Sequence, residues 1–460
     1  MLKKYIGDKA FYRTVLAIAL PIIIQNGITN LAGLLDNLMV GQLGTPQMSG
    51  VSVVNQFVFI FTLALVGATS GPGIFTAQFF GSKDHEGIRH TFRFKVLICL
   101  ILGIVGICLL LFVGTPLINT FLTGEGTAAE KAQTLAFGLD YISALVWGLL
   151  PMSLYFAYSS TLRECGQTTV PMAASTIAVF VNLTFNYMLI FGKFGMPELG
   201  VKGAAWGTVI SRYVELAIVV VWTHRHKLQM PFIQGAYRSF RIPGNLLGKI
   251  LAKGSPLIVN EFLWAFGITF LNQCYSTLGF NVVSATSITT TIANLTNVVN
   301  LALGLTIGIV LGQMLGAQRP AEEIRDTNRK LTTLAVLAGV VFGGVLAIVA
   351  FPFPKLYKSS AEVHLLATQL MLVLAITKPM DTYMFAAYYT LRSGGKTWTT
   401  FFYDSGALWM VTAPLIFILS RYTDISIVPL YAMSFAPNLI KCVVAYFLIR
   451  RGSWIQNLTK

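Results

Sequence analysis

Three acidic residues lie within strongly apolar stretches of this sequence. Glu261 follows Pro256 closely in PLIVNEFLWAFGITFLNQ, and Asp381 and Asp404 occur in two later apolar stretches. A charged, unpaired acid at the centre of a bilayer costs at least ~2.5–3.5 kcal/mol, so such a residue is a functional-site candidate by default. Carboxylates at that depth bind Na⁺ through their oxygens, or take up a proton where burial favours the neutral form. We therefore expect a cation or proton coupling site at Glu261, Asp381 and Asp404.

Two lysines lie close to these acids. Counting from the nearest basic loop puts Glu261 roughly 12 Å, Asp381 about 14 Å and Lys441 about 12 Å into the apolar layer. Lys378 comes less than one helical turn before Asp381, a spacing at which the two side chains can pair. We predict that Lys378 and Lys441 are charge partners of the acids. The alternative is a static set of ion pairs that ties helices together.

A second polar group occurs in the first half of the chain. Asp36 comes late in the first apolar stretch, and Asn182 and Asn186 share one face of the fifth. We expect the three to meet in the outer part of the membrane, although asparagines with this spacing also serve as ordinary hydrogen-bonding residues between membrane helices. Pro21 removes a backbone hydrogen bond from the first helix, and we expect it to act as a hinge.

The elements that must position these residues are membrane-spanning helices. The 460 residues are 55% hydrophobic and only 11% charged, which is too apolar for a soluble protein. We predict an all-α polytopic membrane protein, because the apolar segments are long enough to cross a ~30 Å hydrocarbon layer. A break of the second helix is expected at Gly71, Pro72 and Gly73. The twelve predicted spans are roughly residues 14–39, 49–78, 94–115, 134–160, 170–192, 203–223, 254–278, 283–314, 331–351, 363–390, 398–420 and 426–449.

The net charge of +15 is explained by membrane topology. Lys and Arg concentrate in alternate loops, so by the positive-inside rule both termini are predicted to be cytoplasmic. A nucleic-acid partner is not expected. The five cysteines show no CxxC spacing, and His224 and His226 have no third ligand nearby, so we expect no metal site beyond Na⁺ at Glu261 and Asp381.

An internal repeat divides the chain. At one constant offset Pro21 falls on Pro256, and six further pairs follow in order: Gly44 with Gly279, Ser52 with Ser287, Gly73 with Gly308, Gln78 with Gln313, Gly81 with Gly316 and Lys95 with Lys330. At a slightly shorter offset FAYSSTLRECGQT (156–168) matches FAAYYTLRSGGKT (385–397). An even number of spans in each copy gives both copies the same orientation. We predict two six-helix lobes, residues 1–223 and 254–460, joined by a cytoplasmic linker at 224–253.

Three motifs carry a resemblance to a known family over nearly the whole chain. They are Ala19-Leu20-Pro21 followed by Asp36-x-x-Met39-Val40-Gly41, then Ala77-Gln78-x-x-Gly81 with its repeat partner, and Asn182-x-x-x-Asn186-Tyr187. Together they resemble the multidrug and toxic compound extrusion (MATE) family. The resemblance implies a twelve-helix, two-lobe antiporter of the bacterial plasma membrane. Such a protein exports cationic or amphipathic compounds in exchange for Na⁺ or H⁺.

The residues favour one branch of this family. In the NorM-like branch the acids of the second lobe match Glu261 and Asp381, and the polar site of the first lobe matches Asp36, Asn182 and Asn186. The proton-coupled DinF-like branch typically has Asp where Asn186 stands here. This departure favours the NorM-like assignment.

Two other functions are weighed against the antiporter. A flippase for lipid-linked saccharides belongs to the same wider superfamily. It would need a strongly cationic cavity, and Lys378 and Lys441 are the residues that could supply the positive charge. A membrane-embedded enzyme needs a nucleophile and a base, or a metal set, at one depth, and four of the five histidines lie outside the predicted spans, with His364 at the very start of the tenth. We expect no enzyme activity, no cofactor beyond the coupling ion, and a monomer whose partners are the lipid bilayer and small amphipathic compounds.

Overall fold

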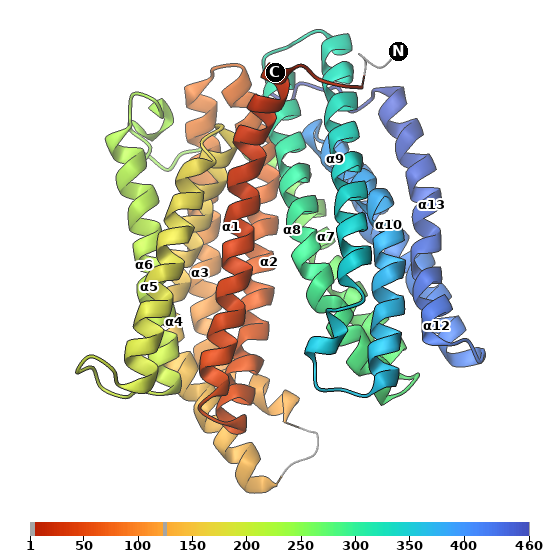
Figure 1. Ribbon diagram of the computed structural model, residues 1–460. Helices are drawn as coiled ribbons and strands as arrows, with labels where there is room; N and C mark the ends of the chain where they lie inside the picture. Colours follow the sequence, from red (N-terminus) through yellow and green to blue (C-terminus); the bar gives the residue numbers. More distant parts are fainter. Residues whose placement is uncertain (1–4, 123–126, 460) are drawn as a thin grey trace. The chain divides into compact units, whose positions relative to one another are not determined.

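The computed structural model describes residues 5–122 and 127–459. Within these ranges the secondary structure is helical, and twelve spans are long and apolar enough to cross a membrane, which confirms the predicted number. Figure 1 shows them in chain order. The first six are α1 (Lys9–Gly41), α2 (Thr45–Gly81), α3 (His85–Phe121), α4 (Ala128–Glu164), α5 (Thr169–Phe191) and α6 (Val201–Arg225).

One of the second six spans is not a single helix. The eleventh span is composite: two five-residue π-helical turns, Phe402–Gly406 and Leu408–Thr412, separate two short α-helices. Such turns are rare and occur often at functional sites. The helices of this half are α7 (Gly244–Ser276), α8 (Phe280–Gly316), α9 (Ala321–Val349), α10 (Ala361–Ser393), α11 (Thr397–Phe401), α12 (Ala413–Tyr422) and α13 (Ile427–Arg451).

Several helix starts are fixed by capping side chains. Asp84 accepts a hydrogen bond from the backbone N–H of Gly87 at 2.9 Å at the start of α3. Thr127 and Glu130 form a reciprocal capping box on α4. Ser360 caps α10 by accepting from the N–H of Val363 at 3.3 Å. These bonds satisfy backbone donors that have no partner inside the helix, and so fix where each span begins.

The expected break of α2 at Gly71, Pro72 and Gly73 is wrong. The helix continues to Gly81, and the carbonyl of Pro72 accepts a hydrogen bond from Thr76 Oγ1 at 3.0 Å. A Cβ atom at Gly73 would overlap the carboxylate of Glu164. Gly73 therefore provides room for a side chain of α4 and does not interrupt the helix.

The repeat predicted from the sequence is visible in the backbone. Positive φ angles favour glycine and are uncommon for other residues. Three pairs of residues that the repeat aligns share this conformation: Gly44 (φ 132°) with Gly279 (122°), Lys83 (60°) with Gln318 (54°), and Gly166 (79°) with Gly395 (71°). The two halves thus use the same turns at the same places.

By internal packing the chain forms two compact units. The amino-terminal unit contains Ile24–Thr76 and Asp84–Leu251. The carboxy-terminal unit contains Met1–Ile23, Ala77–Lys83 and Ala252–Lys460. One boundary thus falls inside α1, shortly after Pro21, and another inside α2. The lobe bounds predicted from the repeat, 1–223 and 254–460 with the linker 224–253, stay a prediction.

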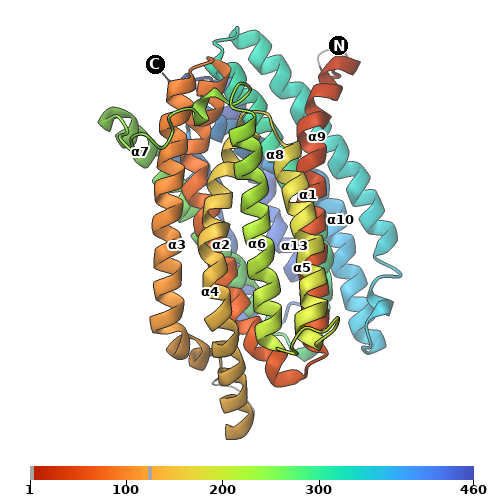
Figure 2. The same cartoon turned by 90° about the vertical axis from the view of Figure 1, so that its left-hand side faces the viewer.

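Within the amino-terminal unit, α3 packs on α4, α4 on α6, and α5 on α6. Figure 2 shows α4, α5 and α6 along their length. Val54 of α2, Leu145 of α4 and Ala205 of α6 belong to one core of this unit. The segment after α6 is fastened to α3, because the guanidinium of Arg93 donates to the carbonyls of Gly235 and Ala236, both at 2.8 Å.

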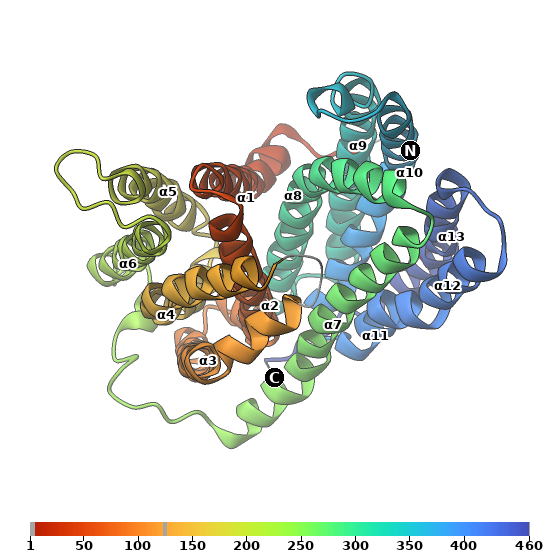
Figure 3. The ribbon, with the colours of Figure 1, turned by 90° about the horizontal axis from the view of Figure 1, so that it is seen from below.

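In the carboxy-terminal unit, one core joins α8, α9 and α10 to the first part of α1. Figure 3 shows the helices of this unit end-on. The chain after α13 also belongs to this core through the fully buried Trp454. The buried Gln78 side chain accepts from the N–H of Leu458 at 2.7 Å and donates to the carbonyls of Ser393 and Gln456. These bonds hold the C-terminal segment against the end of α2.

Candidate functional site

The polar group predicted in the first half forms a contact between three helices. Asp36 of α1 accepts a hydrogen bond from the amide of Asn186 of α5 at 2.7 Å. The amide nitrogen of Asn182 is best placed toward the same carboxylate, 2.7 Å from Oδ1 and 3.3 Å from Oδ2. The hydroxyl oxygen of Thr208 on α6 lies 3.3 Å from the other terminal atom of the Asn182 amide group. Asp36, Asn182 and Asn186 therefore meet, with the two amides as donors to the carboxylate.

This contact depends on the close approach of α5 and α6. A Cβ atom at Gly207 would overlap the side-chain oxygen of Asn186. That oxygen, Oδ1, is buried and has no hydrogen-bond partner among the described residues. Arg212, one turn further along α6, interacts electrostatically with Asp36. The site thus offers two kinds of oxygen atom, carboxylate and amide, beside one guanidinium.

In the carboxy-terminal unit, Asp404 is held by α7 and α13. Its Oδ2 accepts from the amide of Asn260 at 3.0 Å, and its Oδ1 lies 3.7 Å from the Lys441 ammonium. Ser405, in the same π-helical turn, donates its backbone N–H to Asn260 Oδ1 at 3.3 Å and its hydroxyl to the Asn260 carbonyl at 2.9 Å. Lys441 also lies over the ring of Tyr403, 5.1 Å from its centroid.

Glu261 and Asp381 belong to the same chain of charges but have different neighbours. Glu261 interacts electrostatically with Arg392 and Asp404. Asp381 interacts with Lys378 and Lys441. Lys441 therefore links Asp381 to Asp404, and Asp404 links this group to Glu261. Both Glu261 and Asp381 are only partly buried.

The two lysines behave differently. Lys441 forms an ion pair with Asp404. Lys378 donates to the side-chain oxygen of Asn297 at 3.2 Å and interacts with Asp381 only at longer range. A direct Lys378–Asp381 ion pair, which the spacing allows, does not form among the described residues.

A buried network in the amino-terminal unit was not identified from the sequence. Gln25 of α1 donates to Tyr155 and to Ser175, both at 2.9 Å. Ser175 donates to Glu215 Oε1 at 2.6 Å, and Arg212 pairs with Glu215 Oε2 at 2.8 Å. The sequence showed the Arg212–Glu215 spacing on one helix, but it gave no sign that Gln25 and Ser175 reach the same carboxylate.

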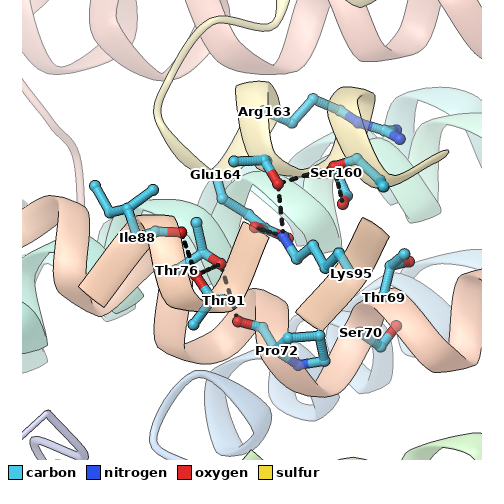
Figure 4. A network of polar contacts seen from close by, with 12 residues as sticks. Thr69, Ser70, Pro72, Thr76, Ile88, Thr91, Lys95, Ser160, Arg163 and Glu164 are labelled. Carbon is cyan, nitrogen blue, oxygen red and sulfur yellow. Dashed lines mark hydrogen bonds and ion pairs between the residues drawn. The ribbon is translucent and has the colours of Figure 1, made fainter. Parts of the chain in front are cut away.

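A second missed cluster joins the ends of α3 and α4 to α2. Lys95 is fully buried, pairs with Glu164 and donates to Thr161 at 3.2 Å. Figure 4 shows this ion pair beside Thr76 and Thr91, whose hydroxyls lie 2.9 Å apart. The repeat motifs contained both charged residues. In the second half Lys330 aligns with Lys95, whereas Ser393 stands where Glu164 is, so only the first half has this charge pair.

The described residues contain no group of three or more His, Cys, Asp or Glu side chains that could hold a metal ion. All five cysteines are free. Na⁺ at Glu261 and Asp381 stays a prediction, with carboxylate oxygens as its ligands.

Twelve apolar spans define a multi-pass membrane protein, and the acids inside them mark candidate sites for an ion or a substrate. The model of the MatE family matches residues 21–188 and 256–418, and the chain belongs to this family. The two matched stretches begin at Pro21 and Pro256, the first aligned pair of the repeat. The expected membership of the MATE family, in its NorM-like branch, is confirmed.

Curated relatives agree with this assignment, and a solved structure has the same fold. The chain is 24% identical to "Probable multidrug resistance protein YoeA" of Bacillus subtilis, covering 97% of this chain and 96% of the relative. It is 22% identical to "Probable multidrug resistance protein NorM" of Thermotoga maritima, covering 96% and 93%. A mutant of the Vibrio cholerae MATE transporter VcmN has the same fold, with a TM-score of 0.85 at 17% identity over 97% of this chain and 98% of that chain.

Proposed function

We propose that this chain is a secondary active multidrug efflux antiporter. It exports cationic or amphipathic compounds in exchange for Na⁺ or H⁺ by alternating access. We place it as a monomer in the plasma membrane of a bacterium, with both termini cytoplasmic. No enzymatic step is proposed, since the relatives are named for drug resistance and the structural neighbours for transport.

The observation that carries this proposal is a hydrogen-bonded carboxylate inside the spans of each unit. Asp36 accepts from Asn186, and Asp404 accepts from Asn260. Amide donors stabilise an ionised carboxylate without neutralising it, so the charge remains available to a cation or a proton. A polar group this costly at membrane depth supports a role in an ion or substrate pathway.

Coupling needs only that ion and substrate favour different states of the transporter. Glu261, Asp381 and Asp404 are three acids, and the basic residues that interact with them are Arg392, Lys378 and Lys441. A cationic drug and a coupling ion would compete for the same carboxylates. Binding of one lowers the affinity for the other, which is the condition for exchange.

The flippase for lipid-linked saccharides remains the competing function. It needs unpaired positive charge to bind a pyrophosphate. Lys441, however, pairs with Asp404, and Lys378 donates to Asn297. Lys441 is thus already paired with a carboxylate, which favours the antiporter over the flippase.

Transport in proteoliposomes tests the proposal. The purified protein is reconstituted, an organic cation is supplied, and Na⁺ and H⁺ gradients are imposed in turn. We expect one gradient to drive movement of the cation, and Glu261→Gln with Asp381→Asn to abolish it. Gradient-driven transport that survives both substitutions would refute the coupling role. Gradient-independent movement of a lipid-linked saccharide would favour the flippase.

A further inference from the structure

Each unit contains a chain of hydrogen bonds and ion pairs that joins three helices, and we call these two equivalent chains relays. The offset that aligns Pro21 with Pro256 also aligns Gln25 with Asn260. The offset that aligns the two FA…TLR motifs also aligns Ser175 with Asp404. In each unit the amide residue donates to the aligned residue of the fifth or eleventh span, at 2.9 Å for Gln25 to Ser175 and 3.0 Å for Asn260 to Asp404.

The third member of each relay is charged and lies on the last span of its half. Ser175 donates to Glu215 on α6, and Asp404 pairs with Lys441 on α13. Aligning the helix ends, Arg225 and Arg451, also aligns Glu215 with Lys441. The carboxylate thus stands at the last position of the relay in one unit and at the middle position in the other.

In both relays the amide donates toward the carboxylate. Gln25 N–H donates to Ser175, and the Ser175 hydroxyl donates in turn to Glu215. Asn260 N–H donates directly to Asp404. A carboxylate that takes up a proton or a cation becomes a weaker acceptor, so the amide loses part of its bond.

Each amide follows its proline by one helical turn. A proline lacks the backbone N–H that would bond to the preceding turn, so the helix is weakest at that point. Pro21 and Pro256 both lie inside continuous helices, α1 and α7. A side-chain hydrogen bond directly after such a point therefore controls the position of the helical segment that follows.

We propose that Gln25 and Asn260 are positioning residues that transmit the charge state of Glu215 and Asp404 to the segments of α1 and α7 that follow Pro21 and Pro256. This inference rests on the proposed antiport for its functional meaning. The relays bring Glu215, Gln25 and Asn260 into the coupling mechanism beside the acids already assigned to it.

Other titratable groups face each carboxylate. Around Glu215 they are Arg212 on the same helix and the Tyr155 phenol of α4. Around Asp404 they are Lys441, Glu261, Tyr388 and Tyr403. The effect of breaking a relay must therefore be distinguished from the effect of disturbing these neighbours. A matched control variant makes this possible. Asn328 provides this control, because it is buried in the carboxy-terminal unit and its side-chain oxygen accepts a hydrogen bond from the uncharged Thr390 at 2.7 Å.

The first test is hydrogen exchange on the full-length protein in detergent, which needs no transport. We expect Glu215→Gln to speed amide exchange after Pro21, and Asp404→Asn to speed it after Pro256, each by about tenfold. Asn328→Leu is expected to leave both segments unchanged. Exchange in Glu215→Gln and Asp404→Asn that matches wild type would overturn the inference, whatever the protein transports.

The second test is the ion concentration that gives half-maximal efflux in proteoliposomes. Asn260→Leu is expected to shift it by about tenfold, and to add no further shift to Asp404→Asn, because both break one relay. Gln25→Met and Glu215→Gln are the corresponding two variants for the relay of the amino-terminal unit, with the same expected result. Asn260→Ser replaces Asn260→Leu if the latter does not fold. Additive shifts, or a shift equal to that of Asn328→Leu, would reject the relay while leaving the antiporter intact. Absence of gradient-driven efflux in wild type would instead reject the proposed function.

Discussion

Asn186 and Asp36 lie 150 residues apart in the sequence and are joined by a 2.7 Å hydrogen bond from amide to carboxylate. The bond connects α5 to the part of α1 beyond Pro21. Because the Asn182 amide lies on the same carboxylate, the charge of Asp36 is shared between two donors of one helix face. The carboxylate of α1 is thus in direct contact with α5.

Asn186→Leu removes one of these donors. We expect the protein to lose about 1–3 kcal/mol of stability, because the partly buried carboxylate keeps its desolvation cost and loses a bond. Thermal unfolding in detergent measures the loss, and efflux is expected to need a higher ion concentration. Thr184→Val, on an exposed face of the same helix, serves as the control. Equal midpoints for the two variants would contradict the role assigned to Asn186.

Gly207→Ala tests the helix contact behind the same site. The added Cβ would overlap the Asn186 side chain, so α5 and α6 must move apart. We expect lower thermal stability by about 1–3 kcal/mol and weaker ion-dependent efflux. Gly33→Ala in α1 meets no atom within 4 Å and is expected to be neutral or stabilising. A neutral Gly207→Ala would show that the approach of the two helices is not tight.

Glu164→Gln breaks the ion pair with the fully buried Lys95. Leaving one charge of a buried pair without its partner typically costs about 3–5 kcal/mol. We expect a large fall in the thermal midpoint, and partial recovery when Lys95→Met is added. The exposed Lys202–Asp140 pair gives the control, since Asp140→Asn is expected to cost less than about 1 kcal/mol. A double variant no more stable than Glu164→Gln would argue against the pair as the cause.

Pro21→Ala tests the hinge of α1. Alanine restores a backbone donor inside the helix, so α1 becomes stiffer close to the boundary between the two compact units. We expect an unchanged or higher thermal midpoint together with efflux slowed about threefold or more. Pro116→Ala restores the same bond in α3, away from any unit boundary, and should leave efflux unchanged. Unaltered efflux in Pro21→Ala would remove the hinge from the mechanism.

Cys165, in the turn between α4 and α5, should resist thiol reagents. Burial raises the pKa of its thiol, and the neighbouring Glu164 raises it further. The reactive thiolate therefore forms only at higher pH than in a free cysteine. In a variant that retains Cys165 as its only cysteine, we expect slow maleimide labelling from pH 7 to about 9. Denaturation in SDS should restore the ordinary rate; fast labelling of the folded protein would show that the site is open.

Much of the fold follows from the sequence for a simple physical reason. A segment of about 20 apolar residues has few alternatives to a membrane-spanning helix, so length and composition gave the twelve spans. The repeat followed from glycine and proline positions, whose backbone conformations are specific enough to align Gly44 with Gly279 and Gly166 with Gly395. The motif Gly71-Pro72-Gly73 misled because glycine also marks close packing, here against Glu164.

The candidate site was only partly predictable. The acids stood out because a charge in an apolar helix is costly, and this drew attention to Glu261, Asp381, Asp404 and Asp36. Gln25 and Asn260 did not stand out, because a neutral amide in such a helix costs less and is common. Only their alignment in the repeat could have drawn attention to them.

The sequence by itself determined which segments cross the membrane, which residue types they carry and that the two halves share a plan. Only the tertiary structure decided the partners: Lys441 with Asp404 in place of Lys378 with Asp381, and Gln25 with Ser175 and Glu215. The physical reason is distance. Helical periodicity fixes the face on which a side chain lies, whereas the packing of helices remote in sequence fixes which groups come within hydrogen-bonding range.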